Sequence, residues 1–280
     1  MRIAILGSNG QLGQDLTSEL ATHELHAFTR ADFDITDHGR ARKVLTEAGP
    51  EVIVNLTAYH RVDDCERNPE LAYSVNATAV LNLVRIANDL GAKLVQFSTD
   101  YVFDGRSAAP YTELSPPFPL SVYANSRLAG EYLVRTEALH AVVIRTCGLY
   151  GHAGSMGKGG NFVETMLKKA RNNEPIGVVN DQVVTPTSTK DLSRQVALLV
   201  ATDHEGLFHM TNEGSCSWYE FAAAIFEISG LKADLRPTTS QAFNAPARRP
   251  SYSVLENHRL KELGLNRMLP WREALAEYLG

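Results

Sequence analysis

The sequence predicts an α/β protein built on a doubly wound parallel sheet of the Rossmann type, with a smaller C-terminal lobe. Two observations support this prediction. Short apolar segments alternate with amphipathic segments through the first half of the chain, which is typical of a parallel sheet covered by helices on both faces. The first apolar segment also runs directly into a glycine-rich turn, a common start of a dinucleotide-binding unit. A chain of 280 residues is long enough to bury a substantial core.

The strands and helices of the N-terminal part follow from hydrophobic periodicity. The apolar run at 2–7 predicts a buried strand, and Leu12, Leu16 and Leu20 recur at every fourth position, which predicts a helix over 10–20. Gly91 is expected to close a long helix, because glycine readily adopts the left-handed conformation found at helix ends. Further strands are expected at 25–29, 51–57, 93–99 and 141–146, and further helices at 41–48, 70–91 and about 123–137.

The alternation breaks after residue 147, which indicates a second lobe. We interpret residues 1–147 plus about 187–203 as the dinucleotide-binding domain, and about 148–186 plus 204–280 as the second lobe. Within this lobe a helix is expected at 218–229. The glycine-rich segment 151–160 is interpreted as a flap beside the substrate, with a plain linker as the alternative.

Composition and charge argue against several classes of function. The net charge of -5 gives no electrostatic reason to expect nucleic acid or an anionic membrane as a partner. The three cysteines are widely spaced and match no metal or redox pattern, so reduced thiols are expected. No histidine pair has the spacing of helical metal ligands, so no metal site is expected. The N-terminus resembles no signal peptide and no apolar run reaches membrane-spanning length, which predicts a cytoplasmic protein.

A glycine cradle at 7–13 predicts phosphate binding. Its three glycines form a G-x-x-G-x-x-G pattern between the first strand and the first helix. Glycines here permit a tight turn and close approach of the backbone to a pyrophosphate, while the helix N-terminus offers free N–H groups. A glycine-rich turn without a ligand is the alternative. The predicted cofactor contacts in this segment are Gly7, Asn9, Gly10, Gln11, Leu12 and Gly13.

The end of the second predicted strand bears on the choice of coenzyme. Arg30 stands near the position where an NAD-selective site commonly has an acidic residue. Because a cation suits a 2′-phosphate, NADPH is the predicted coenzyme. NADH is the alternative, since Arg30 also reads as a solvated loop charge and Asp32 or Asp34 can meet the adenosine. Asp34 and Ile35 are predicted to contact the adenine end.

A proton donor is predicted at Tyr123. Reduction of a ketone by hydride leaves negative charge on oxygen, so the site needs an acid and a hydrogen-bonding partner for that oxygen. Tyr123 and Arg127 are four residues apart, on one face of the predicted helix, and a fixed cation stabilises a phenolate. Thr99 ends a strand at the sheet edge where such folds bind ligands. On spacing alone, a purely structural pair is the alternative.

Longer motifs run almost from end to end of the chain. They are the cradle with QLG (11–13), ADFDITD (31–37), NLTAYHRVDDCERNPELAYSVNA (55–77), STDYVFDG (98–105), PYTE (110–113), Tyr123 followed by RLAGE (127–131), VIRT (143–146), GGNFVETML (159–167), NDQVVTPT (180–187), ARRPSYSVLEN (247–257) and LPWREAL (269–275). In these motifs the chain resembles the dTDP-4-dehydrorhamnose reductase family of the extended short-chain dehydrogenase/reductase superfamily.

The resemblance implies NAD(P)H-dependent reduction of the C4 keto group of a dTDP-4-keto-6-deoxyhexose, dTDP-4-dehydrorhamnose to dTDP-L-rhamnose, and makes the second lobe the sugar-nucleotide-binding lobe. A homodimer is expected by similarity. Carried over by position, the catalytic residues are Thr99, Tyr123 and Arg127. Ala58, Tyr59, Tyr123 and Arg127 are implied to bind the cofactor. Thr99, Val102, Phe103, Tyr123, Asn161, Phe162, Gln182 and Arg248 are implied to bind the sugar nucleotide.

Two departures from the family pattern fall near the chemistry. The family has Lys where this chain has Arg127, and it commonly has a Trp in the stretch occupied here by 147–150. Arg keeps the charge and the hydrogen-bond donors of Lys, but it does not release a proton. Reduction of a different nucleotide-linked keto sugar, or a nucleotide-binding regulatory protein with little catalysis, are therefore the alternatives.

Overall fold

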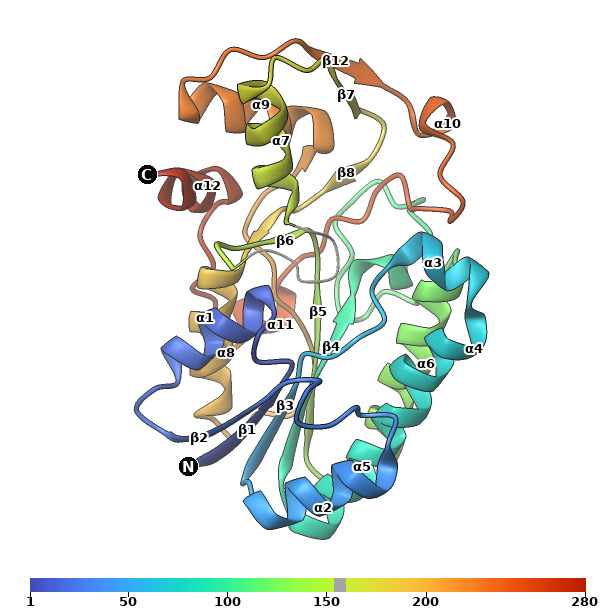
Figure 1. Ribbon diagram of the computed structural model, residues 1–280, viewed down its shortest axis with the longest axis vertical. Coiled ribbons are helices and arrows are strands. Elements are labelled where there is room, and N and C mark those ends of the chain that lie inside the picture. The colour runs from blue at the N-terminus through green and yellow to red at the C-terminus, as the bar shows by residue number, and fades with distance from the viewer. Residues whose placement is uncertain (154–159) are drawn as a thin grey trace.

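The computed structural model describes residues 1–153 and 160–280. Its centre is a six-stranded parallel sheet in the order β10-β5-β4-β3-β1-β2 (Figure 1), which confirms the predicted fold class. The strands are β1 (Arg2–Leu6), β2 (Glu24–Phe28), β3 (Val52–Asn55), β4 (Lys93–Thr99), β5 (Ala141–Thr146) and β10 (Gly206–His209). The chain order reverses between β1 and β3, and open α/β sheets bind ligands at such a switch point.

Two helical layers cover the sheet because alternate strand residues face opposite sides. In β1, Ile3 and Ile5 pack toward one layer, whereas Ala4 and Leu6 pack toward the other. Figure 1 shows α1 and α8 on one side of the sheet and α2, α5 and α6 on the other. These helices are α1 (Gln11–Glu19), α8 (Thr189–Val200), α2 (His38–Ala48), α5 (Ala79–Leu90) and α6 (Val122–Glu137).

The C-terminal lobe lies beyond the carboxyl ends of the strands and has a hydrophobic cluster of its own (Figure 1). Phe221 is fully buried at its centre. The lobe contains α7 (Phe162–Arg171), α9 (Trp218–Ser229), α10 (Ser240–Phe243) and α12 (Trp271–Leu279), and the paired strands β7 (Ile176–Val179) with β12 (Leu235–Thr238), β8 (Val183–Val184) with β11 (Cys216–Ser217) and β6 (Leu149–Tyr150) with β9 (Thr187–Ser188). In the described part of the chain, no helix combines the length and apolar character needed to span a bilayer.

The structure corrects the predicted boundary after residue 203. Residues 206–209, expected in the sugar-nucleotide lobe, form β10 at the edge of the main sheet. The short helix α11 (His258–Glu262) packs on the same domain through Leu260. Leu207 and Phe208 are buried in the two main hydrophobic clusters, so this short return strand completes the first core.

The predicted helix over 70–91 is confirmed in its extent, with Gly91 as its left-handed cap, but one of its turns is π-helical. The chain forms α3 (Val62–Arg67), α4 (Pro69–Tyr73), a π-helical turn (Ser74–Thr78) and then α5. Asn76 in the π turn is buried, and its side chain accepts a hydrogen bond from the Tyr59 N–H (2.9 Å) and donates to the Tyr59 carbonyl (3.1 Å) and to Ser126 Oγ (3.0 Å). A regular helical pattern does not reveal such a turn, which joins the loop after β3 to α6.

Close packing of α6 on the π turn makes Gly130 a sensitive position. A Cβ at Gly130 would lie 2.1 Å from the backbone oxygen of Asn76, which cannot move without shifting the turn. We expect Gly130→Ala to lower the free energy of unfolding by about 1–3 kcal/mol, measured by urea denaturation. Gly39→Ala is the matched control, because its Cβ would have only one neighbour, at 3.7 Å, and alanine favours a helix. Equal stability of the two variants would contradict this packing argument.

Candidate active site

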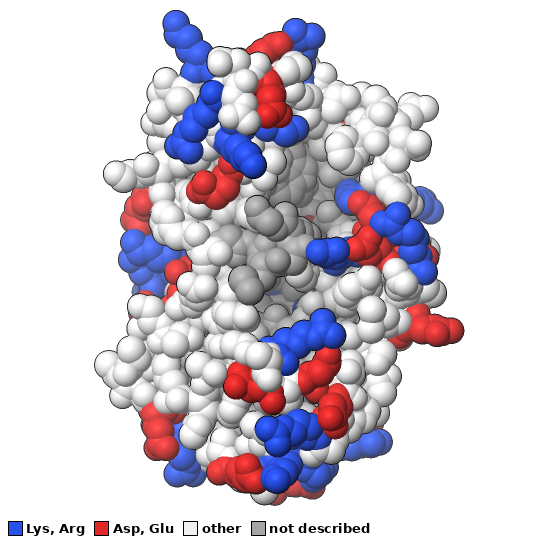
Figure 2. All heavy atoms as spheres, in the orientation of Figure 1, with Lys and Arg blue, Asp and Glu red and all other residues white. Residues whose placement is uncertain are grey.

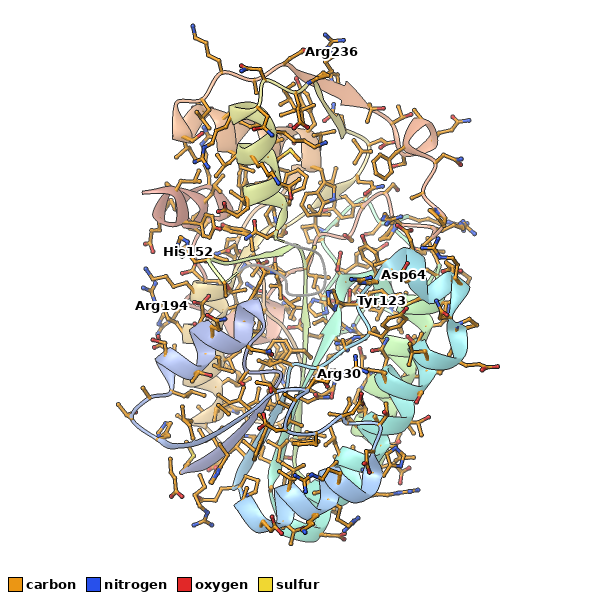
Figure 3. The ribbon with its side chains drawn as sticks, in the orientation of Figure 1. Arg30, Asp64, Tyr123, His152, Arg194 and Arg236 are labelled. Atoms are coloured by element: carbon orange, nitrogen blue, oxygen red, sulfur yellow. The ribbon has the colours of Figure 1, made fainter. Side chains whose placement is uncertain are left out.

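A cleft of about 550 Å³ lies between the carboxyl ends of the sheet strands and the C-terminal lobe. Figure 3 places Tyr123 at this level, between the sheet and the lobe. The face of the molecule in Figure 2 carries interspersed acidic and basic side chains rather than one large patch of a single sign. The cleft lining includes Gly7, Gly10, Gln11, Leu12, Gly13, Ala58, Thr99, Tyr123, Arg127 and Thr146 from the first domain, and Asn161, Phe162, Thr165 and Trp218 from the lobe.

The glycine cradle has the geometry that a pyrophosphate site needs. Gly7 has a φ of +84°, a conformation that favours glycine. A Cβ on Gly13 would lie 2.4 Å from the Gly7 carbonyl oxygen, so only glycine lets α1 pack this closely. Gly10 caps α1 without a side-chain hydrogen bond, and the N-terminus of this helix therefore presents free N–H groups. Asn9 is exposed and does not line the cleft, whereas the other predicted cofactor contacts of the cradle do.

Arg30 and Asp34 lie outside the cleft lining, at the carboxyl end of β2. The Arg30 side chain is 88% exposed, and its Nη2 lies 2.8 Å from Asp34 Oδ2. The other Asp34 oxygen accepts hydrogen bonds from the backbone and hydroxyl of Thr36. Ile35, also predicted to contact the adenine end, is buried in the core and lies outside the cleft lining.

Tyr123 sits in the first turn of α6, whose start is held by three side-chain hydrogen bonds. Ser121 Oγ accepts from the Ala124 N–H, Glu66 Oε1 accepts from the Val122 N–H (2.8 Å), and Ser126 Oγ donates to the Tyr123 carbonyl (2.8 Å). Burial raises the pKa of Tyr123 above its ordinary value, while the Arg127 charge and a hydrogen bond with Thr99 act to lower it. The phenol is therefore protonated at neutral pH, as a proton donor must be.

Thr99 ends β4 beside this phenol. Its hydroxyl donates to Asp100 Oδ1 (3.1 Å) and accepts from the Tyr101 N–H (3.2 Å). The Tyr101 ring packs edge-on against Tyr123, with ring centroids 6.0 Å apart. The strand end and the helix start thus bring the predicted acid and its hydroxyl partner together.

Arg127 carries buried donors that nothing in the described residues satisfies. Its side chain is only 6% exposed, and Nη2 donates to the Phe97 carbonyl of β4. Nε and Nη1 have no hydrogen-bond partner in the described chain, and neither does the Thr146 hydroxyl in the same cleft. Buried donors of this kind are costly unless they are paired. A bound nucleotide with ribose hydroxyls supplies the missing acceptors, so these residues fit the predicted dinucleotide.

Asn161 and Phe162, predicted to bind the sugar nucleotide, line the cleft at the start of α7. The Asn161 amide is already engaged: Oδ1 accepts from the Glu164 N–H (2.9 Å), and Nδ2 donates to the Gly151 carbonyl (2.8 Å) and to the Tyr278 hydroxyl (3.2 Å). Phe162 packs on Trp218, with centroids 4.8 Å apart. Asn161 therefore shapes this wall, while the two rings offer an aromatic surface. Of the predicted flap at 151–160, residues 154–159 lie outside the described residues.

Five other predicted ligand contacts lie outside the cleft lining. Val102 and Phe103 are fully buried in a core cluster, because a short 3₁₀ turn after β4 directs them inward. Gln182 does not line the cleft, and its Nε2 donates to Ser240 Oγ (2.8 Å). Arg248 is exposed and outside the lining. Its neighbour Arg249 is the one that turns inward, to Asp63 of α3 (2.9 Å). Tyr59 is also outside the lining, although Ala58 belongs to it.

Several cleft residues were missed by sequence reasoning. Asp100 and Cys147 directly follow β4 and β5, so the strand-end rule that found Thr99 could have found both. Burial raises the pKa of the Asp100 carboxyl and of the Cys147 thiol, which lie 3.1 Å apart. Trp218 comes from the lobe, and no local signal marked it. Among residues 1–153 and 160–280, no group of His, Cys, Asp or Glu is arranged to hold a metal ion.

Comparison with known proteins settles the family. A family profile described as the RmlD substrate binding domain matches residues 1–280. The chain belongs to this family. A dTDP-4-dehydrorhamnose reductase of Streptomyces griseus is 38% identical over 286 residues, which cover 99% of this chain and 92% of that protein.

Solved structures of the family agree with the fold. A dTDP-4-dehydrorhamnose reductase from Clostridium acetobutylicum is 40% identical, covers 100% of this chain and 98% of its own, and has a TM-score of 0.95. The enzyme of that name from Bacillus anthracis, in complex with NADP, is 37% identical with a TM-score of 0.94, over 99% of this chain and 98% of that one. The resemblance predicted from the motifs is therefore confirmed, and the regulatory alternative is not favoured.

Proposed function

We propose that this protein is an NADPH-dependent reductase that converts the C4 keto group of dTDP-4-dehydrorhamnose to the hydroxyl of dTDP-L-rhamnose. The observation that carries this proposal is the meeting of Thr99, Tyr123 and Arg127 with the glycine cradle in one cleft. Full-length similarity to reductases of that name supports the same reaction. A homodimer and a cytoplasmic location are part of the proposal, and light scattering of the purified protein tests the first.

The residues of the cleft can perform the acid–base part of a ketone reduction. The bound coenzyme would supply a hydride to the carbonyl carbon. Tyr123 gives its proton to the carbonyl oxygen, so that one C–H and one O–H bond form as the C=O double bond becomes single. Thr99 holds that oxygen by its hydroxyl, and Arg127 stabilises the phenolate that Tyr123 becomes. Because a guanidinium does not deprotonate, Tyr123 recovers its proton through another route, such as ribose and water.

The reaction can be tested with purified dTDP-4-keto-6-deoxy sugars. We expect loss of NADPH absorbance on mixing protein, NADPH and the 4-dehydrorhamnose derivative, and NMR of the product should show the hydroxyl at C4 in the rhamnose configuration. Turnover with a different dTDP-linked keto sugar, but none with this one, would redirect the proposal to that sugar. Tight NADPH binding with no turnover of any of them would refute it.

Coenzyme preference gives a second test, at Arg30. We expect Arg30→Ala to raise KM for NADPH by about 10-fold, because an exposed charge-assisted contact to a 2′-phosphate lies at the low end of its usual range. KM for NADH should stay within about 2-fold, since NADH has no such phosphate. Asp34→Asn is the companion variant: it releases Arg30 from its 2.8 Å ion pair and should lower KM for NADPH. Equal KM changes for both coenzymes would show that Arg30 does not read the phosphate.

A further inference from the structure

A buried ion pair fastens α6 to the sheet one turn beyond Arg127. Glu131 of α6 and Arg145 of β5 are each 1% exposed. Arg145 donates from Nε to Glu131 Oε2 (2.9 Å) and from Nη2 to Oε1 (2.5 Å), a two-pronged contact with fixed direction. Ser98 Oγ of β4 donates to the same carboxylate (3.0 Å). One side chain of the helix is thus bonded to two neighbouring strands.

Neutral and aromatic groups surround the Arg145 side chain. Burial lowers the pKa of His209 to about 3, so the ring is neutral at physiological pH. His209 Nδ1 lies 3.1 Å from the Tyr111 carbonyl oxygen, which only accepts, so Nδ1 carries the hydrogen and Nε2 accepts from Arg145 at 3.4 Å. The Arg145 guanidinium also lies over the Phe103 ring, 5.0 Å from its centroid. Arg135, half exposed, also lies near Glu131, with Nη1 3.4 Å from Oε1.

The position of Glu131 relates it to the site. Tyr123, Arg127 and Glu131 succeed each other at intervals of four, so they form one stripe along α6. The two strand residues that bind Glu131 directly precede cleft residues: Ser98 comes before Thr99, and Arg145 comes before Thr146. The Glu131 contacts therefore help to fix the depth of α6 over the ends of β4 and β5, together with the hydrogen bond from Arg127 to the Phe97 carbonyl of β4.

We infer that Glu131 is a positioning residue for the reduction, acting through the placement of Tyr123 and Arg127 relative to Thr99. This inference rests on the proposed function. A displacement of about 1 Å between reacting groups can cost about 100-fold in rate, and a helix held only by apolar side chains can slide by such a distance more easily than one held by directed bonds. The rival reading is that Glu131 only stabilises the fold, since losing one partner of a buried ion pair is destabilising in any position.

Two variants separate geometry from charge. Glu131→Asp keeps the charge but shortens the side chain by one methylene. The carboxylate then reaches Ser98 and Arg145 only if α6 shifts toward the two strands. Glu131→Gln keeps the length but leaves the Arg145 cation uncompensated. Asp191→Asn is the matched control. Asp191 is a buried carboxylate, 5% exposed, that accepts a hydrogen bond from Asn212 (2.7 Å). It belongs to α8, which packs on the face of the sheet opposite α6, and it does not line the cleft.

We expect Glu131→Asp to lower kcat by about 10- to 100-fold per folded molecule, and to raise the NADPH dissociation constant, measured by nucleotide fluorescence, because Arg127 moves with the helix. In Glu131→Gln the unbalanced cation favours the phenolate, so the alkaline loss of kcat should begin at lower pH. The charged or titratable groups that act on the Tyr123 titration, all unchanged in this variant, are Arg127 on α6, Asp100 after β4 and Cys65 on α3, and the Thr99 hydroxyl acts on it through a hydrogen bond.

Asp191→Asn should melt at lower temperature yet keep the wild-type kcat, NADPH affinity and pH profile. If Glu131→Asp behaves like this control, the inference is overturned even when wild-type turnover upholds the proposed function. If the wild type itself shows no turnover, the proposed function fails. The positioning of Arg127 by Glu131 can then still be tested, by comparing the NADPH affinities of Glu131→Asp and Asp191→Asn. Glu131→Asp also keeps the test decisive if Glu131→Gln does not fold.

Discussion

Replacement of Tyr123 by Phe is expected to lower kcat by about 10²- to 10⁴-fold, the usual contribution of a positioned general acid. The change removes only the hydroxyl. The ring contact with Tyr101 and the hydrogen bonds that hold the start of α6 do not involve this atom. Rate should therefore fall while the fold and the cofactor site remain, and steady-state kinetics with saturating NADPH measure the effect.

Control measurements make this result specific. The NADPH dissociation constant of Tyr123→Phe should change far less than kcat, because the cradle and Arg127 are untouched and only one implied cofactor contact is lost, and the melting temperature should not fall. Loss of cofactor binding together with activity would point to a structural role for Tyr123. Retention of more than about a tenth of wild-type kcat would mean that another group donates the proton, with Asp100, which lines the cleft and bonds to Thr99, as the candidate.

The titration of Tyr123 sets the direction of the pH dependence. A ketone reduction needs the protonated phenol, so kcat should be level at low and neutral pH and fall as pH rises through the Tyr123 pKa. Burial raises this pKa, with Arg127 acting against it. The alkaline decline should therefore begin above neutral pH, and it should be absent in Tyr123→Phe, whose residual rate has no phenol to lose.

Elements built from local periodicity could be predicted from the sequence, whereas elements set by distant contacts could not. The strand at 93–99 and the helix at 218–229 appear with their predicted bounds, because continuous apolar or amphipathic runs determine them. The helix expected over 70–91 is present, but its π turn, in which Asn76 bonds to Tyr59 17 positions away, could not be predicted from the helical pattern. Nothing in the sequence of residues 206–209 indicates that they pair with β5. Their place in the main sheet was therefore missed.

The same division holds for the site. Thr99, Tyr123 and Arg127 were accessible from a strand end and a helical interval, both of which are local patterns. Val102 and Phe103 were placed in the sugar site by motif position, yet a 3₁₀ turn sends them into the core. Trp218 forms a wall of the cleft with Phe162. Its place there is set by the packing of the lobe over the sheet, which the sequence around Trp218 does not indicate.

Replacement of Arg127 by Met should separate stability from function. Arg127 is buried, with one hydrogen bond to the Phe97 carbonyl and two donors that lack partners in the described residues. A buried charge in this state is unfavourable, and an apolar side chain of similar volume should leave the free energy of unfolding unchanged or raise it by about 1–4 kcal/mol. Catalysis should nevertheless fall by about 10²- to 10³-fold, because the cation no longer stabilises the phenolate. The alkaline decline of kcat should move to higher pH, since the Tyr123 pKa rises without its cation.

Arg127→Lys completes this test, because it restores a point charge that can also release a proton. NADPH should protect the wild type and the Lys variant against thermal unfolding more than it protects the Met variant, since only a cation satisfies the ribose and the phenolate. If return of the proton to Tyr123 limits the wild type, Arg127→Lys will turn over faster than wild type; if it does not, the two will match. A Met variant as active as wild type would mean that Arg127 is not needed for catalysis. If that variant were also more stable than wild type, the buried Arg127 charge would have neither a catalytic nor a stabilising role.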